Sequence, residues 1–280
     1  MRSRGFKPSV FYNRRIQNEI NLASMDYLYK QCHYININVA VLLERGMEME
    51  KSLKDKKILV VGGSSGIGLA VAKFVYKLGA KVVIASRSAV IRHDALVGDV
   101  GERIQTVSFD IASAHEIGSL LDAMRKIDHL VIAVRPDIKP ALFQETDFDS
   151  AREAFESKFW GSYRLIQAAW NQINPGGSII MTTGIAGEKV FKGSSTMGII
   201  NNALETLCRS LAVELAPIRV NAVSPGFVEP KSREVQERAL QFPIQRLATK
   251  EEIARAYVYL MTNDYVTGTT MVVDGGARLI

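Results

Sequence analysis

Short apolar runs alternate with segments of helical periodicity from about residue 57 to the end of the chain. Most of these runs are rich in Val, Ile and Leu, which is typical of buried strands. The expected strands are Ile58–Val61, Val82–Ala85, Thr106–Phe109, Leu130–Val134, Ser178–Thr182, Arg219–Val223 and Met271–Val273. Between the first two, apolar positions from Ala70 to Leu78 recur at helical spacing, and Gly79 ends the predicted helix. Apolar strands separated by helices predict an α/β fold: a Rossmann-type, doubly wound parallel sheet with helices on both faces.

A glycine-rich loop lies between the first expected strand and the first expected helix. Its glycines permit a tight turn, let backbone approach a diphosphate, and let the helix pack on the strand. The N-terminus of the helix offers N–H donors and partial positive charge to phosphates. A glycine triplet alone is a weak signal, but its place between strand and helix favours a dinucleotide site over a merely structural turn. The residues expected to contact the dinucleotide here are Gly62, Ser64, Ser65, Gly66, Ile67 and Gly68.

The end of the second strand selects between NAD(H) and NADP(H), because an acid there bonds the adenine ribose hydroxyls. The strand ends in Ala85-Ser86-Arg87-Ser88, without an acid. Arginine grips a 2′-phosphate by charge and by its fork geometry. Arg87, with Ser86 and Ser64, therefore predicts NADP(H) rather than NAD(H). A solvated surface arginine is the alternative interpretation of Arg87.

The composition is that of an ordinary globular protein, with 47% hydrophobic and 23% charged residues over 280 positions. It excludes collagen-like, disulfide-framework and wholly disordered classes. The net charge of +6 gives no argument for a nucleic-acid partner. No apolar run approaches the ~18 residues that span a membrane, so no membrane partner is expected. Two cysteines, Cys32 and Cys208, fit a reduced, cytoplasmic compartment, and no metal site is expected.

Residues 1–50 do not share this alternation and are interpreted as an extension that the fold does not require. The preferred interpretation is a disordered segment or a mis-assigned start, with Met47 or Met49 as the true one. Residues 1–20 are rich in arginine and carry one acid, Glu19. An organellar targeting peptide and a functional arm are therefore the alternatives. Residues 51–280 are expected to form a single dinucleotide-binding domain.

Several further motifs occur in order over residues 53–280. They are Asp128-His129-Leu130-Val131, Gly177-Ser178-Ile179-Ile180, Ser210-Leu211-Ala212, Arg219-Val220-Asn221-Ala222-Val223-Ser224-Pro225-Gly226 and Val273-Asp274-Gly275-Gly276. Through them, and through the glycine loop, the chain resembles the short-chain dehydrogenase/reductase family, of the type related to 3-oxoacyl-carrier-protein reductases. The resemblance implies a nicotinamide-dependent oxidoreductase that forms a homodimer or homotetramer. It also implies cofactor contacts from Asp110, Ile111, Ala133, Pro225, Gly226 and Val228.

Four side chains carry the chemistry of this family. A tyrosine transfers a proton, a lysine lowers the pKa of that tyrosine, a serine positions the substrate, and an asparagine holds a water. In register with the motifs, these positions hold Met197, Asn201, Gly184 and Lys158 respectively. The resemblance therefore predicts a degenerate catalytic site. Arg135 stands where the family has a glycine, and is expected to pair with a phosphate or an acidic substrate, or to obstruct the cofactor.

Lysine and asparagine are thus exchanged between two positions that face one another in the family's proton relay. Lys158 is expected to bring an ammonium to nearly the same place from the opposite helix, where a buried lysine can act as acid, base or anchor. A surface lysine in a drifted site is the alternative. Thr183 keeps a hydroxyl beside the vacated serine position. Met197 has no proton to exchange, and its spacing with downstream apolar positions indicates packing.

Three functions remain open at this point. The first is an atypical NADP(H)-dependent oxidoreductase of an unknown small molecule, using relocated groups such as Lys158 and Thr183. The second is a catalytically inactive homologue that senses the cofactor or serves as the partner subunit of a heteromer. The third is a non-redox isomerase or dehydratase on the same scaffold.

Overall fold

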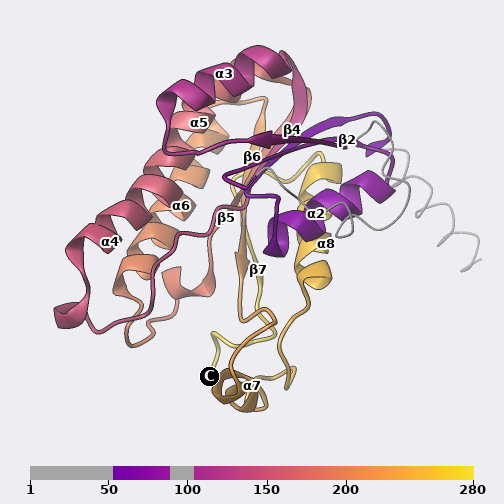
Figure 1. Ribbon diagram of the computed structural model, residues 1–280. Coiled ribbons are helices and arrows are strands. Elements are labelled where there is room, and N and C mark those ends of the chain that lie inside the picture. Colours follow the sequence, from indigo (N-terminus) through magenta and orange to yellow (C-terminus); the bar gives the residue numbers. More distant parts are fainter. Residues whose placement is uncertain (1–52, 89–103) are drawn as a thin grey trace, which may run out of the picture. The chain divides into compact units, whose positions relative to one another are not determined.

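A computed structural model describes residues 53–88 and 104–280. The interpretations of residues 1–50 as an extension, and of residues 1–20 as a targeting peptide, lie outside the described residues. Seven parallel strands form one sheet in the order β3-β2-β1-β4-β5-β6-β7. The strands are β1 (Lys57–Val61), β2 (Lys81–Ser86), β3 (Ile104–Ser108), β4 (Ile127–Ile132), β5 (Ile173–Thr182), β6 (Arg219–Pro225) and β7 (Thr270–Val273) (Figure 1).

The seven-stranded Rossmann-type sheet is the predicted one, but several strands differ from their expected ranges; β5, for example, begins at Ile173 rather than at Ser178. Residues 105–108 of β3 are exposed, so the expectation of a buried strand is wrong there. β3 is an edge strand whose only neighbour in the described sheet is β2. β4 ends at Ile132 rather than at the expected Val134. The Ala133 amide donates the last hydrogen bond to β1, to the Val61 oxygen at 2.8 Å, because β1 then turns into the glycine loop.

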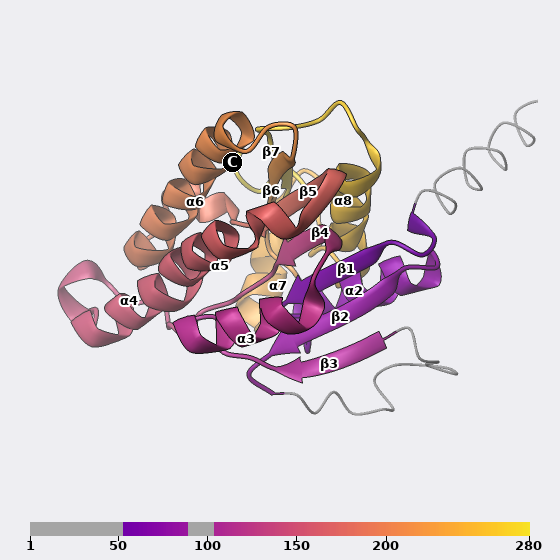
Figure 2. The ribbon, with the colours of Figure 1, turned by 90° about the horizontal axis from the view of Figure 1, so that it is seen from above.

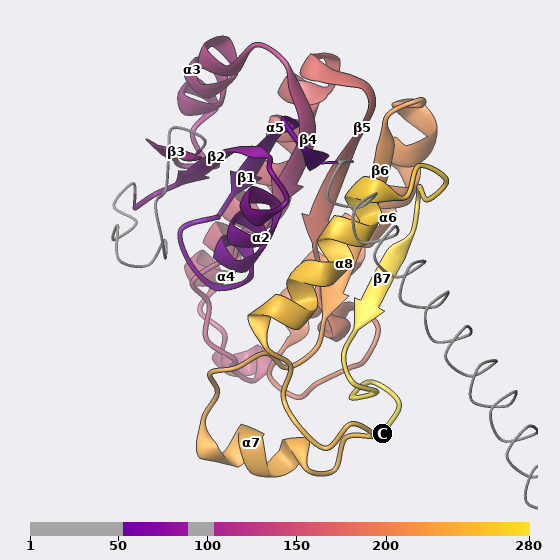
Figure 3. The ribbon, with the colours of Figure 1, turned by 90° about the vertical axis from the view of Figure 1, so that its right-hand side faces the viewer.

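Alternate side chains of the strands enter two separate cores, as the period of two requires. Ile58 and Val60 face the core covered by α2 (Gly66–Lys77) and α8 (Lys250–Thr262). Leu59 and Val61 face the core covered by α3 (Ala114–Met124), α5 (Gly161–Ala169) and α6 (Ser195–Glu214). Figures 2 and 3 show these two sets of helices on opposite faces of the sheet. The fold is therefore the three-layered one that near-continuous apolar strands demand.

Before α5 the chain is helical without a break, but its hydrogen-bond pattern changes. The segment consists of α4 (Phe148–Ala154), a π-helix η3 (Phe155–Trp160) and then α5. A π-helix adds one residue to a turn and often occurs at functional sites. The remaining elements are α7 (Arg233–Ala239) and the 3-10 turns η2 (Phe143–Glu145), η4 (Trp170–Gln172) and η5 (Ile185–Gly187).

Side-chain hydrogen bonds cap both ends of α8. Thr249 and Glu252 form a reciprocal capping box at its N-terminus. At the other end, the buried Arg219 of β6 donates to the carbonyl oxygens of Leu260 at 2.6 Å and Met261 at 2.8 Å. The guanidinium thus satisfies carbonyls that the end of a helix leaves free. Within the described residues, no helix is both long and apolar enough to cross a membrane.

Candidate active site

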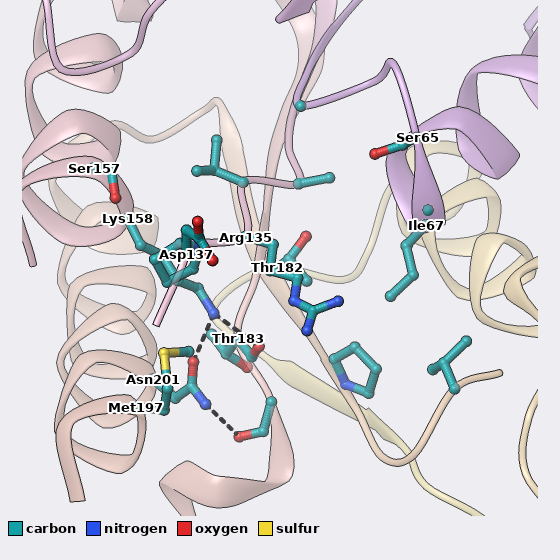
Figure 4. A pocket seen from close by; sticks show the side chains of 18 of the residues that line it. Ser65, Ile67, Arg135, Asp137, Ser157, Lys158, Thr182, Thr183, Met197 and Asn201 are labelled. Carbon is teal, nitrogen blue, oxygen red and sulfur yellow. Dashed lines mark hydrogen bonds between the residues drawn. The ribbon is translucent and has the colours of Figure 1, made fainter. Parts of the chain in front are cut away.

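A cavity of about 1270 Å³ opens at the carboxyl ends of the strands. It is lined by residues that follow β1, β2, β4, β5 and β6 (Figure 4). From β1 the chain adds β2 and β3 on one side; it then returns to place β4 on the other side of β1 and continues outward to β7. The strand order therefore reverses between β1 and β4. In open α/β sheets, ligands bind in the crevice outside the carboxyl ends at such a reversal point.

The glycine loop has the geometry that a diphosphate needs. Gly62 and Gly66 have backbone φ values of +79° and +58°, which residues other than glycine rarely adopt. A Cβ on Gly62 would meet the Ala133 oxygen at 2.6 Å, whereas one on Gly66 would project into open space. The first turn of α2 holds no acid, and the Ser65 side chain makes no cap hydrogen bond. The loop therefore leaves a cradle of free N–H groups that fits phosphate oxygens.

Next to this cradle, hydroxyl groups and one guanidinium follow β2. The Ser86 hydroxyl donates to the Ser88 carbonyl oxygen at 2.9 Å, and the hydroxyls of Ser88 and Ser64 lie 3.5 Å apart. Arg87 lines the cavity and is exposed, with no carboxylate within 4.0 Å among the described residues. A phosphate on the adenine ribose would meet this guanidinium and these hydroxyls, so the residues present fit NADP(H).

The structure brings the expected cofactor residues together at this cavity. Those that line it are Gly62, Ser64, Ser65, Gly66, Ile67, Ser86, Arg87, Asp110, Ile111, Ala133, Pro225, Gly226 and Val228. Gly68 does not line it. A Cβ on Gly68 would collide with the Gly62 oxygen, so this glycine instead allows α2 to pack close to the loop.

Lys158 is the most unusual side chain of the site. It lies on the π-helix η3, is only 4% exposed, and lines the cavity. Its ammonium donates to Asn201 Oδ1 at 2.8 Å and to the Thr183 carbonyl oxygen at 3.2 Å (Figure 4). Burial lowers the pKa of Lys158 to about 7, although the nearby Glu205 carboxylate acts to raise it. The predicted meeting of the exchanged lysine and asparagine therefore occurs in the structure.

Asn201 joins the two sides of the site. It accepts from Lys158 and donates through Nδ2 to the Gly184 carbonyl oxygen at 3.2 Å. The Thr183 hydroxyl has two acceptors in reach, the Val223 carbonyl oxygen at 3.3 Å and the Glu205 carboxylate, and the bond to Thr183 acts to lower the pKa of Glu205. The catalytic assignment of Thr183 stays a prediction. Met197 is half-buried at the cavity wall and packs against the apolar core, as its helical spacing indicates.

Three further groups of the site were not found by sequence reasoning. Glu205, one helical turn after Asn201, is half-buried, and burial raises the pKa of its carboxyl. Thr182 donates to the Ile132 oxygen at 2.9 Å and lies 2.6 Å from the buried Tyr257 hydroxyl of α8. Lys231 lines the cavity from the segment after β6. Only the spacing of Glu205 from Asn201 was a signal in the sequence, because residues four apart share a helix face.

The sequence is similar to proteins of one known family. Residues 61–278 match the family model described as "Enoyl-(Acyl carrier protein) reductase". A human protein named 3-oxoacyl-[acyl-carrier-protein] reductase is 32% identical over 237 residues, covering 81% of this chain and 99% of its own length. The chain belongs to the short-chain dehydrogenase/reductase family.

Solved structures of this family superimpose on the described fold. One short-chain dehydrogenase/reductase family protein is 34% identical with a TM-score of 0.74, covering 82% of this chain and 100% of its own. A small-chain dehydrogenase solved in complex with NADPH is 29% identical with a TM-score of 0.71, covering 81% of this chain and 100% of its own. The family resemblance and the fold expected from the sequence are therefore confirmed.

Proposed function

We propose that this short-chain dehydrogenase/reductase is an NADP(H)-dependent oxidoreductase of a small carbonyl compound, in which Lys158 is the proton donor. The observation that carries the proposal is the position of the Lys158 ammonium, buried at the wall of the cavity and held by Asn201 and the Thr183 carbonyl. An ammonium has three N–H donors, and these two bonds use two of them. The third is available to a ligand oxygen.

The cofactor assignment has two kinds of support. Among residues 53–88 and 104–280, the N–H groups at the start of α2 have no capping side chain, and the Arg87 guanidinium, next to Ser88, has no carboxylate partner. A structural neighbour was solved with NADPH, and the human relative bears the name of an acyl-carrier-protein reductase. When bound, the reduced cofactor supplies a hydride to the carbonyl carbon.

The chain itself supplies the proton. As negative charge develops on the carbonyl oxygen, a Lys158 N–H bond breaks and an O–H bond forms, which leaves a neutral amine and an alcohol. Asn201 keeps the nitrogen at the cavity wall throughout, because its Oδ1 accepts from the amine as well as from the ammonium. The amine regains its proton from solvent before the next turnover.

The acidity of Lys158 suits this role. General acids work best when their pKa lies near the working pH, and burial lowers the pKa of Lys158 to about 7. The charged group that acts on it is Glu205 of α6, itself half-buried. Burial shifts both groups toward their neutral forms and outweighs their mutual attraction. Reduction needs the ammonium, so its rate should fall as the pH rises above about 7.

A second function is favoured by the same bonds. Two of the three Lys158 donors are satisfied inside the protein, and Met197 is packed into the core. A lysine that only ties η3 to α6 would leave a cofactor-binding protein without catalytic power. Such a protein would bind NADPH and act as a sensor or a partner subunit.

The two functions separate in one experiment. NADPH binding is measured by fluorescence titration, and turnover by NADPH consumption over a panel of ketones, aldehydes, enones and imines. We expect Lys158→Met to bind NADPH within about twofold of wild type and to lose about 100-fold or more in kcat, the size of a general-acid contribution. Lys139→Met is the matched control, because Lys139 is exposed and does not line the cavity.

Each result has a separate meaning. Full turnover in Lys158→Met would refute the proton-donor role. NADPH binding without turnover over the whole panel favours the sensor or partner function. Failure of the wild-type protein to bind NADPH would refute the cofactor assignment and both functions with it.

A further inference from the structure

The reactive end of the cavity is unusually rich in cations. Arg135 follows β4, Lys192 lies after β5, and Lys231 and Arg238 come from the segment after β6, and all four line the cavity. Their places at the ends of three neighbouring strands bring them around the opening that Lys158 borders. Arg135 is seen beside this opening in Figure 4.

Arg135 and Lys231 act on each other directly. Burial and the Arg135 charge both lower the pKa of Lys231. The two like charges repel, and a bound anion near both would offset the repulsion. The structure thus holds two cations where one negative group would stabilise both.

Neither cation is neutralised by a residue that the structure describes. Asp137 and Glu229 also line the cavity, but within residues 53–88 and 104–280 no carboxylate lies within 4.0 Å of Arg135 or Lys231. Neither side chain makes a hydrogen bond there. Both groups keep their donors for a ligand, as residues that recognise an oxyanion do.

Arg135 and Lys231 follow strands on the opposite side of β1 from β2, the strand that Arg87 follows. Neighbouring strands lie about 4.8 Å apart, and the sheet order places β6 three strands from β1, whose end forms the phosphate cradle. The carboxyl end of β6 is therefore about 14 Å from that of β1, and Lys231 lies in the segment that follows β6. The strands that precede Arg135 and Lys231 are β4 and β6, which flank β5, and β5 ends one residue before Thr183, an acceptor of the Lys158 ammonium.

Apolar rings border the same end. Phe191 and Phe227 line the cavity with their centroids 5.7 Å apart, edge to face. The Arg238 guanidinium lies over the Phe191 ring, 5.8 Å from its centroid. Rings beside cations suit a ligand with one apolar part and one anionic group.

We infer that Arg135 and Lys231 form a subsite for the carboxylate or phosphate of the substrate, an oxyanion-bearing carbonyl compound whose apolar part packs on Phe191 and Phe227. The inference deepens the proposed function and rests on it for the reaction, but the binding of the anion can be tested without the cofactor.

The test compares matched probes by calorimetric titration, with the protein free and with it saturated by NADP⁺. Benzoylformate carries an apolar ring, a ketone and a carboxylate, and its methyl ester replaces the charged oxygen by a neutral methoxy group. Phenyl phosphate tests whether the subsite prefers a phosphate to a carboxylate. We expect benzoylformate or phenyl phosphate to bind at least tenfold more tightly than the ester, and the tighter of the two identifies the anionic group.

Substitutions then locate the subsite. Arg135→Gln and Lys231→Gln should each weaken the anionic probe about tenfold and change the binding of the ester by less than about twofold, because one charge-assisted contact is lost in each. Arg87→Gln should weaken NADPH but not the probe. Lys139→Gln, outside the cavity, should change neither.

Two outcomes would overturn the inference. One is equal affinity of wild type for the anionic probes and the ester. The other is a loss of NADPH affinity of more than about fivefold in Arg135→Gln and Lys231→Gln with anion binding unchanged, which would assign the pair to the cofactor. If the wild-type protein fails to bind NADPH, the proposed function fails, and the titrations without cofactor still decide the subsite.

Discussion

Replacing Lys158 by methionine should change how the stability of the protein depends on pH. Methionine keeps most of the length of the side chain and removes the charge. The Lys158 pKa falls from 10.5 to about 7 on burial. Between these values the unfolded chain holds the lysine proton and the folded chain does not, so the free energy of unfolding rises with pH. The slope is about 1.4 kcal/mol per pH unit, or ~5 kcal/mol over the whole interval.

The methionine variant lacks this term at every pH. It also leaves Asn201 Oδ1 and the Thr183 oxygen without their donor, at a cost of about 1–3 kcal/mol that does not vary over this pH range. The difference in unfolding free energy, wild type minus Lys158→Met, should therefore rise by ~3 kcal/mol between about pH 7.5 and 9.5. Other titrating groups are common to both proteins and cancel in the difference.

The assay is urea unfolding of both proteins at several pH values across this interval, followed by circular dichroism. Lys139→Met is the control, and its difference from wild type should be flat because its lysine is exposed in the folded protein. A flat difference for Lys158→Met as well would mean that Lys158 keeps an ordinary pKa. The proton-donor role at neutral pH would then lose its basis.

Four further substitutions, one of them a control, probe the cofactor site and the fold. Arg87→Gln should weaken NADPH about 10–100-fold and leave NADH within about twofold in fluorescence titrations, and an equal loss for both would contradict a 2′-phosphate contact. Gly66→Ala places a Cβ at φ +58° inside the cradle, so NADPH should bind about tenfold or more weakly. Gly118→Ala, where the Cβ also meets nothing, should leave binding unchanged and raise the Tm, because alanine favours the α3 helix. Arg219→Met removes the bonds that end α8 and should lower the unfolding free energy in urea by about 3 kcal/mol, whereas an unchanged midpoint would contradict its capping role.

The order of strands and helices was predictable because it depends on local periodicity. A short apolar run such as Ile58–Val61 that ends at glycines 62, 63 and 66 is typical of a buried strand followed by a turn. The exposure of β3 was not predictable in this way. Whether a strand lies at an edge depends on the order in which the whole chain is laid into the sheet.

The sequence by itself determined the layered fold, the cofactor loop and the family, and the family resemblance predicted that Met197 and Asn201 stand where a tyrosine and a lysine are expected. Only the tertiary structure decided what surrounds Lys158, because its partners come from β5 and α6, 25 and 43 residues further along the chain. The presence of Arg135 and Lys231 at one cavity has the same origin. Packing of distant segments sets the burial and the electrostatic field of a side chain, and these set its acidity and the ligand it can hold.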